Sequence, residues 1–257
     1  MSEKNREGKR AAREKLAVQR EKQKSRDKRR RALIVGAGVV CVLGLAAVIG
    51  VVAANAGKDD GSESAGPIVA PSGAKGKDSL AIPVGEEGAK STLTIWEDFR
   101  CPACKAFELA YRDTIHELTG AGQLKVEYHL ATIIDGNMGG TGSRKSANAA
   151  ACAQDAGKFP AYHDVLYDNQ PPETDDAYAD ENKLLDLARK VDGLDTTLFQ
   201  ECVKNGKHNS WVEKSNKAFF DGGFTGTPTV LLDGKNIYKD SSMTPAKFKR
   251  MVEDANK

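Results

Sequence analysis

Two cysteines separated by two residues lie between a strand pattern and a helix pattern, and this stretch constrains the fold most. Residues 91–96 are rich in β-branched and aromatic side chains and alternate in polarity, which is typical of a strand. From Phe107 onward, apolar residues recur at helical spacing. The sequence Cys101-Pro102-Ala103-Cys104 therefore predicts an α/β domain with two thiols where a strand turns into a helix.

This position predicts different chemistry for the two thiols. We expect Cys101 at the helix N-cap or at the first helical position, and Pro102 suits the first turn because its missing N–H has no partner there. The free N–H groups and the positive end of the helix dipole stabilise a thiolate, which is the form that attacks disulfides. Cys104 lies one turn later on the same face, where it can resolve a mixed disulfide.

The alternative interpretation of this motif is half of a structural zinc site. Such a site needs a second pair of ligands at similar spacing. Cys152 and Cys202 are isolated in the sequence, and no pair of histidines follows at zinc-ligand spacing. The sequence therefore favours redox chemistry and predicts no metal site.

The charge of the chain is concentrated at its beginning. Residues 1–31 contain 14 Lys/Arg and 5 Asp/Glu, although the whole chain has a formal net charge of only +2. A basic tail can bind nucleic acid or an anionic membrane surface. This tail has no aromatic residue and runs directly into an apolar segment, so we expect a cytoplasmic, membrane-flanking tail and no nucleic-acid partner.

Residues 32–54 are 23 residues without a charge, which predicts a single transmembrane helix. At about 1.5 Å per residue they span roughly 34 Å, enough to cross a bilayer core of about 30 Å. The basic residues beside the span place the N-terminus in the cytoplasm and the rest outside. A cleaved signal peptide is the alternative, because Ala54-Asn55-Ala56 resembles a cleavage site, but the long tail and long apolar core favour an uncleaved anchor. Residues 55–79 are rich in small and polar residues and predict a flexible linker.

The remaining part, residues 80–257, is long enough for one well-packed domain. A second strand is expected at 124–130, followed by a glycine-rich loop at 136–142 and by about 80 residues of helical periodicity. Residues 229–232 predict another strand, which turns at Asp233-Gly234 and returns through 237–238. Thr244 is expected to cap a final helix with Pro245 at its first position.

Two segments of the domain resemble a known family. Residues 96–107 are similar to the active-site stretch of the thioredoxin superfamily, and in particular of the DsbA-like thiol–disulfide oxidoreductases. Residues 223–234 contain Thr227-Pro228 ahead of a strand, which resembles the cis-proline loop that in this family packs beside the cysteines and pairs with the substrate backbone. The resemblance covers residue 80 to the C-terminus. It implies an α/β thioredoxin-like fold with a helical insertion at about 140–222, preceded here by the predicted membrane anchor.

The resemblance also implies a function. We expect an extracytoplasmic oxidase that introduces disulfides into exported proteins through Cys101 and Cys104, with Thr227 and Pro228 holding the substrate. No cofactor is required, and a membrane partner that reoxidises the pair is implied by the family. A reductase of the same chemistry is one alternative. A non-catalytic peptide-binding protein or holdase, in which the cysteines are vestigial, is another.

Two more cysteines fall on predicted helices of the insertion. With Cys101 and Cys104 paired, and Cys41 a small apolar residue in the membrane, Cys152 and Cys202 remain for a structural disulfide in an oxidising compartment. The alternative is two free buried thiols.

Several residues near the motif stay open at this point. Ala103 replaces the histidine of the best-known DsbA motif, so we expect the pKa of Cys101 to lie in the upper half of the range of about 3.5–7.5. One of Glu97 and Asp98 can be a buried acid that relays protons to Cys104, while the other, or both, can be solvated at the strand end. The four histidines of the chain have no partner at metal-ligand spacing, so surface or packing roles are expected.

Overall fold

A computed structural model of the chain describes residues 67–257. The predicted cytoplasmic tail, the predicted span at 32–54 and residues 55–66 of the predicted linker lie outside the described residues. Within 67–257, none of the helices has the length and apolar character needed to span a bilayer.

A five-stranded mixed sheet forms the centre of the described region. Its strands lie in the order β1-β3-β2-β4-β5, with β2 and β3 parallel and all other neighbours antiparallel. The register aligns Ile95 of β2 with Tyr128 of β3 on one side and with Val230 of β4 on the other. The bounds are β1 Ile82–Val84, β2 Ser91–Glu97, β3 Leu124–Leu130, β4 Thr229–Leu232 and β5 Lys235–Asn236.

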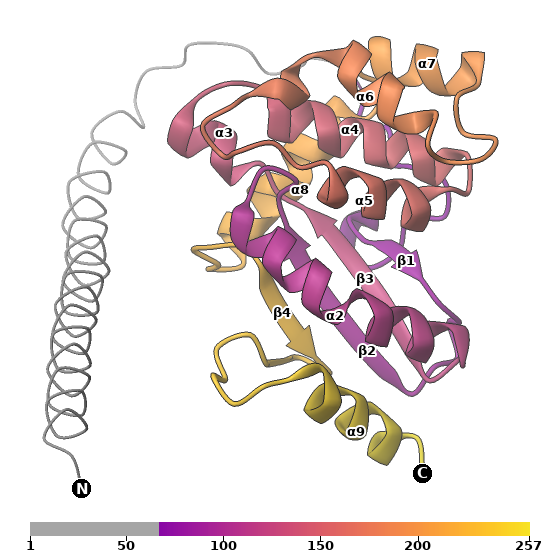
Figure 1. The fold of residues 1–257 in the computed structure, drawn as a ribbon, viewed down its shortest axis with the longest axis vertical. Coiled ribbons are helices and arrows are strands. Elements are labelled where there is room, and N and C mark those ends of the chain that lie inside the picture. Colours follow the sequence, from indigo (N-terminus) through magenta and orange to yellow (C-terminus); the bar gives the residue numbers. More distant parts are fainter. Residues whose placement is uncertain (1–66) are drawn as a thin grey trace, which may run out of the picture. The chain divides into compact units, whose positions relative to one another are not determined.

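Helices cover both faces of the sheet (Figure 1). α2 lies across one face together with α9, and α8 lies behind the sheet in this view. Because side chains alternate along a strand, Glu97 faces α5 whereas Trp96 contacts Phe219 of α8 on the opposite face. The bounds are α2 Pro102–Gly120, α3 Ile133–Met138, α4 Gly142–Asp155, α5 Phe159–Asp168, α6 Glu181–Ala188, α7 Thr197–Lys204, α8 Asn209–Asp221 and α9 Pro245–Ala255, with short 3-10 turns at Lys77–Ser79 and Ala177–Ala179.

The helical insertion is confirmed. Helices α3 to α8 lie between β3 and β4 in the sequence, and α4 to α7 gather beyond one end of the sheet (Figure 1). α4 is the buried centre of this group, because its alanine-rich sequence lets α5 and α7 pack closely against it. The expected cap of the last helix is also present: the Thr244 hydroxyl accepts a hydrogen bond from the Lys247 N–H, and Pro245 opens α9.

Three local details differ from the sequence expectations. The glycine-rich segment 136–142 is partly helical, since α3 extends through Gly136 to Met138. The returning strand β5 occupies residues 235–236 and not 237–238 as expected. It begins directly after Asp233 and Gly234, because both residues adopt a positive φ and reverse the chain there. Ordered contacts also begin before residue 80, since the Ser72 N–H donates to Asp155, and the predicted linker at 55–79 therefore overlaps the folded region.

Candidate active site

The first turn of α2 places the two thiols as the sequence predicted. Cys101 is the N-cap residue with extended backbone angles, and Pro102 occupies the first helical position. The Cys101 N–H donates to the Asp98 carbonyl oxygen at 2.9 Å, which closes the turn between β2 and α2. Both thiols are unpaired and buried, with 5% of Cys101 and none of Cys104 exposed. The small remaining exposure belongs to Cys101, which is therefore the less deeply buried residue of the pair.

The loop before β4 reaches the same sulfur from the far end of the chain. The peptide bond between Thr227 and Pro228 is cis. The Cys101 thiol donates to the Thr227 carbonyl oxygen at 3.3 Å. The structure therefore brings together all four residues for which the sequence predicted a role in thiol exchange: Cys101, Cys104, Thr227 and Pro228.

The two thiols differ strongly in acidity. A hydrogen bond from the Cys104 side chain is the main cause that lowers the pKa of Cys101 to about 6, against the opposing effect of burial. The Thr227 side chain and the N–H groups of Ala103 and Cys104 add to this effect. Burial raises the pKa of Cys104 well above that of an ordinary thiol, and the thiolate of Cys101 raises it further. At neutral pH the pair is therefore a thiolate at Cys101 and a thiol at Cys104.

A glutamine from the insertion holds the active-site turn. The Gln170 side-chain amide donates to the Phe99 carbonyl at 2.8 Å and to the Cys101 carbonyl at 3.0 Å. Lys105, on the next turn of α2, reaches back to the Gln170 carbonyl at 3.5 Å. These contacts tie the first turn of α2 to the segment after α5. An amide donor at the Cys101 carbonyl also offsets the negative end of that peptide dipole beside the thiolate.

A buried arginine fixes the same turn from the other side. Arg100 is 2% exposed, and its guanidinium lies 2.7 Å from Asp135 and 2.8 Å from Asp176. It also donates to the Gly139 and Glu173 carbonyls. Arg100 directly precedes Cys101, and both carboxylates belong to the insertion. These ion pairs therefore join the active-site turn to two segments of the insertion.

A second group of buried titratable side chains, Glu97, Glu108 and His163, lies near Cys104. Glu97 of β2 is fully buried and accepts from His163 Nε2 of α5 at 3.0 Å. Burial disfavours the charged imidazolium, but Glu97 and Glu108 outweigh it and raise the pKa of His163 to about 10. Burial raises the pKa of Glu108 to about 8, which keeps this carboxyl neutral at pH 7. Negative charge on Glu97 also contributes to the high pKa of Cys104.

Asp98 is the other acid that the sequence placed near the motif, and it is also buried. Its carboxylate accepts from the Arg100 N–H at 2.8 Å and from the Ile134 N–H at 2.9 Å. Burial raises the pKa of Asp98 to about 7 in spite of these donors. Of the two alternatives that the sequence left open, solvation at the strand end does not hold for Glu97 or Asp98, because both are fully buried. Proton transfer to Cys104 by one of them stays a prediction.

An aromatic surface borders the thiols. Phe107 and Tyr111 of α2 stack with ring centroids 4.7 Å apart, and Tyr238 makes an edge contact with Phe107. Tyr238 is 45% exposed. Partial burial is the main cause that raises the pKa of Tyr238, and the nearby Cys104 and Cys101 raise it further. An exposed aromatic ring this close to a reactive thiol can contact an apolar side chain of a bound peptide.

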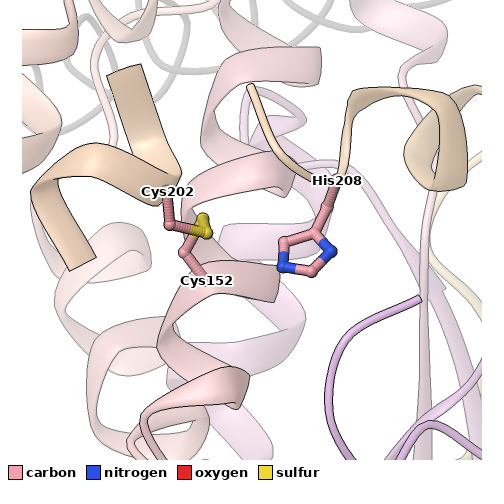
Figure 2. A group of neighbouring side chains, drawn as sticks. All are labelled: Cys152, Cys202 and His208. Atoms are coloured by element: carbon pink, nitrogen blue, oxygen red, sulfur yellow. A yellow bond between two sulfur atoms is a disulfide. The ribbon is translucent and has the colours of Figure 1, made fainter. Parts of the chain in front are cut away.

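The predicted second pair is a disulfide: Cys152 of α4 is bonded to Cys202 of α7 (Figure 2). With His208 these sulfurs form one of two groups of close metal-donor atoms among residues 67–257. The disulfide removes both thiolates from metal binding. The other group is Glu97, Glu108 and His163, in which the facing imidazole nitrogen already contacts Glu97.

No sequence pattern was used to predict the contacts that Gln170, Arg100, Glu108 and His163 make around the thiols. Glu108 lies one helical turn after Cys104, a spacing that could have placed it on the buried face of α2. The partners of the other three come from segments 35 to 76 residues away, so no local pattern indicates them.

The fold and the paired thiols define a thioredoxin-like protein with a helical insertion. Residues 78–254 match the family model described as "Thioredoxin", and the chain belongs to that family.

Three similar proteins illustrate the relationship. The chain is 25% identical to "Disulfide bond formation protein D" of Bacillus subtilis over 157 residues, which cover 60% of this chain and 68% of that protein. It is 28% identical over 171 residues to the serine/threonine-protein kinase PknE of Mycobacterium tuberculosis, covering 62% of this chain but only 30% of the kinase. The crystal structure of oxidised DsbA from Mycobacterium tuberculosis superposes with a TM-score of 0.59 at 26% identity, covering 68% of this chain and 92% of that one.

Proposed function

We propose that this chain is an extracytoplasmic thiol–disulfide oxidase that introduces disulfides into exported proteins. The observation that carries the thiol–disulfide exchange chemistry is the split acidity of the pair: Cys101 with a pKa of about 6 beside a fully buried Cys104 with a pKa well above normal. The oxidase direction rests on the resemblance to DsbA-like proteins. The names of the bacillary disulfide-bond-formation protein and the mycobacterial DsbA support the same chemistry.

The proposed reaction begins with the oxidised pair. A substrate thiolate attacks the Cys101 sulfur, the bond to Cys104 breaks, and the electron pair leaves on Cys104, which takes up a proton. The substrate backbone pairs at the loop of Thr227 and Pro228, and an apolar substrate side chain contacts Tyr238. A second substrate thiolate then attacks the mixed disulfide and displaces Cys101 as a stabilised thiolate. The substrate has lost two electrons and the enzyme pair has gained them.

The acidity of Cys101 contributes to this direction. A pKa of about 6 makes the thiolate about tenfold more abundant than the thiol at pH 7. This stabilises the reduced form by about 1.4 kcal/mol relative to an ordinary thiol, which corresponds to about 30 mV toward a stronger oxidant. The gap between thioredoxin and DsbA is about 150 mV. Acidity alone therefore does not decide between oxidase and reductase.

The deciding measurement is the reduction potential of the Cys101–Cys104 pair in the full chain. The full chain is equilibrated in glutathione buffers and then alkylated. Mass spectrometry then gives the reduced fraction of the peptide that carries both cysteines. A potential of about −120 to −180 mV supports the oxidase, whereas a value near about −270 mV assigns the alternative reductase function. Cys101→Ser separates both from a peptide-binding holdase, because a holdase keeps its activity without the thiol.

The location belongs to the same proposal. We place residues 32–54 across the cell membrane, with the basic tail in the cytoplasm and the folded domain outside. A separate membrane protein would reoxidise the Cys101–Cys104 pair. The uncharged length of residues 32–54 and the 14 basic residues of the preceding tail support this topology. Immunoblots of membrane and medium fractions test it, and a shortened protein in the medium would contradict the anchor.

A further inference from the structure

Opening the active-site disulfide requires a proton at a buried sulfur. When a thiolate attacks Cys101, the electron pair leaves on Cys104, and burial raises the pKa of Cys104 well above that of an ordinary thiol. The leaving sulfur therefore takes up a proton at neutral pH. Cys104 has no exposed surface, so bulk water does not contact it. A buried acid close to Cys104 is the source of protons that the fold offers.

Glu108 is placed to reach Cys104. The two residues lie at positions i and i+4 of α2, and both are on its buried face. Side chains at this spacing have Cβ atoms about 5–6 Å apart, and long helical side chains lean toward the preceding turn. The Glu108 side chain therefore extends toward Cys104. Its Oε1 atom is buried and has no hydrogen-bond partner within residues 67–257.

The two other buried acids near the thiols are held by hydrogen bonds. Glu97 Oε1 accepts from His163 Nε2 at 3.0 Å, and the two oxygens of Asp98 accept from two backbone N–H groups. Hydrogen bonds of this kind stabilise the carboxylate form. Glu108 differs, because burial raises its pKa to about 8 and keeps its carboxyl protonated at pH 7.

We propose that Glu108 supplies the proton to Cys104 when the Cys101–Cys104 disulfide opens, and that His163 is a positioning residue that balances the charge left on Glu108. One ring nitrogen of His163 lies within 4.8 Å of a carboxyl oxygen of Glu97 and of Glu108. Burial lowers the pKa of His163, but the two glutamates outweigh burial and raise it to about 10, so the ring is a cation. The inference rests on thiol exchange at the proposed active site, and it assigns the proton to a residue of α2.

The proposed step is a disulfide opening coupled to one proton transfer. A thiolate attacks the Cys101 sulfur and forms a new disulfide with it. The bond to Cys104 breaks, its electron pair goes to the Cys104 sulfur, and the proton of Glu108 moves to that sulfur. Glu108 is left as a carboxylate beside the His163 cation and regains a proton from solvent water. In the reverse step, the Glu108 carboxylate takes the proton from Cys104 as this sulfur attacks the mixed disulfide.

The test is the reduction of the oxidised full chain by dithiothreitol between about pH 6 and 9. Samples are quenched by alkylation, and mass spectrometry follows the peptide that carries Cys101 and Cys104. Rate constants are expressed per dithiothreitol thiolate, so that the acidity of the reagent cancels. We expect this constant to fall as the pH rises through about 8, where Glu108 loses its proton. A constant that does not change over this range would overturn the proposal, and this measurement needs no variant.

Variants assign the pH profile to one residue, because several titratable groups surround Glu108. These groups are Cys104 and Arg112 of α2, Glu97 of β2, Tyr128 of β3, and His163, Asp164 and Tyr167 of α5. Glu108→Gln keeps the size of the side chain but has no acidic proton. We expect its rate at pH 7 to fall by about tenfold or more and its pH dependence to flatten. Glu117→Gln is the matched control, because it makes the same change at an exposed position of α2.

Two more variants separate the remaining explanations. His163→Gln removes the cation, which is the strongest influence that opposes burial at Glu108, so the midpoint of the pH profile should move to higher pH. An unchanged midpoint would contradict the positioning role of His163. A loss of the pH dependence in Asp98→Asn, with a native profile in Glu108→Gln, would overturn the assignment to Glu108.

The same measurements distinguish this inference from the proposed function. If the native pair exchanges with dithiothreitol and a folded Glu108→Gln variant matches its rate and pH profile, the assignment of the proton to Glu108 is wrong and the exchange chemistry stands. If the native pair does not exchange at all, the proposed function and this inference both fail.

Discussion

The acidity of Cys101 depends on its neighbour, and Cys104→Ala tests this dependence. The hydrogen bond from the Cys104 side chain is the largest single cause of the lowered pKa of Cys101. Alanine removes the donor while the N-cap position and the Thr227 contact remain. We therefore predict a clear rise in the pKa of Cys101 in this variant, with little change in the fold.

The size of the rise follows from the kind of hydrogen bond that is lost. A hydrogen bond to a charged acceptor contributes about 1.5–3 kcal/mol, and about 1.4 kcal/mol corresponds to a tenfold change in the thiolate-to-thiol ratio. At pH 6 the native protein has about half of Cys101 as thiolate. In Cys104→Ala this fraction should fall to roughly one-tenth or one-hundredth.

The assay is a pH titration of thiolate ultraviolet absorbance, supported by the rate of Cys101 alkylation at each pH. Cys104→Ser is the matched control, because its hydroxyl can still donate and should preserve most of the acidity. The reasoning is refuted if Cys104→Ala titrates at the same pH as Cys104→Ser. The helix terminus and the Thr227 loop would then account for the acidity alone.

Three further predictions follow from the described contacts. Gln170→Glu places a carboxylate against two carbonyl oxygens, so we expect it to raise the pKa of Cys101 more than Gln170→Ala does; equal titrations of the two variants would exclude this electrostatic role. Burial raises the pKa of Glu108 from an unfolded value of about 4.3 to about 8, so its contribution to stability is complete below about pH 4.3 and is lost as the pH rises through 8. Urea unfolding between pH 5 and 8 should therefore show a flatter decline in Glu108→Gln, and an equally steep decline would contradict a neutral buried carboxyl. Replacing Cys152 and Cys202 by alanine opens a loop of 50 residues and should cost about 4 kcal/mol in denaturant unfolding, whereas a loss below about 1 kcal/mol would contradict the loop-entropy argument.

Local sequence patterns predicted the parts of this fold that local physics determines. The alternation in 91–96 and 124–130 gave β2 and β3, and Thr244 with Pro245 gave the start of α9. Cys101 and Pro102 at the start of α2 were also predictable, because capping preferences operate within one turn.

The environment of the thiols could not be predicted in the same way. Burial of Glu97 and Asp98 depends on where the insertion packs, and the strand sequence contains no information about that. Gln170 is 69 residues from Cys101, and its amide meets the active-site turn only after α5 has docked. The placement of Thr227 beside Cys101 came from family resemblance, since spacing alone does not bring two residues 126 positions apart into contact.

The separation of 126 positions between Cys101 and Thr227 has a consequence during synthesis of the chain. A chain made at about 5–20 residues per second exposes Cys101 about 6 to 25 seconds before Thr227 is synthesised. During this interval the thiol pair exists without the loop that contacts Cys101. A newly made chain therefore lacks the complete thiol site until Thr227 arrives, and any truncation before Thr227 leaves the two cysteines without their partner loop.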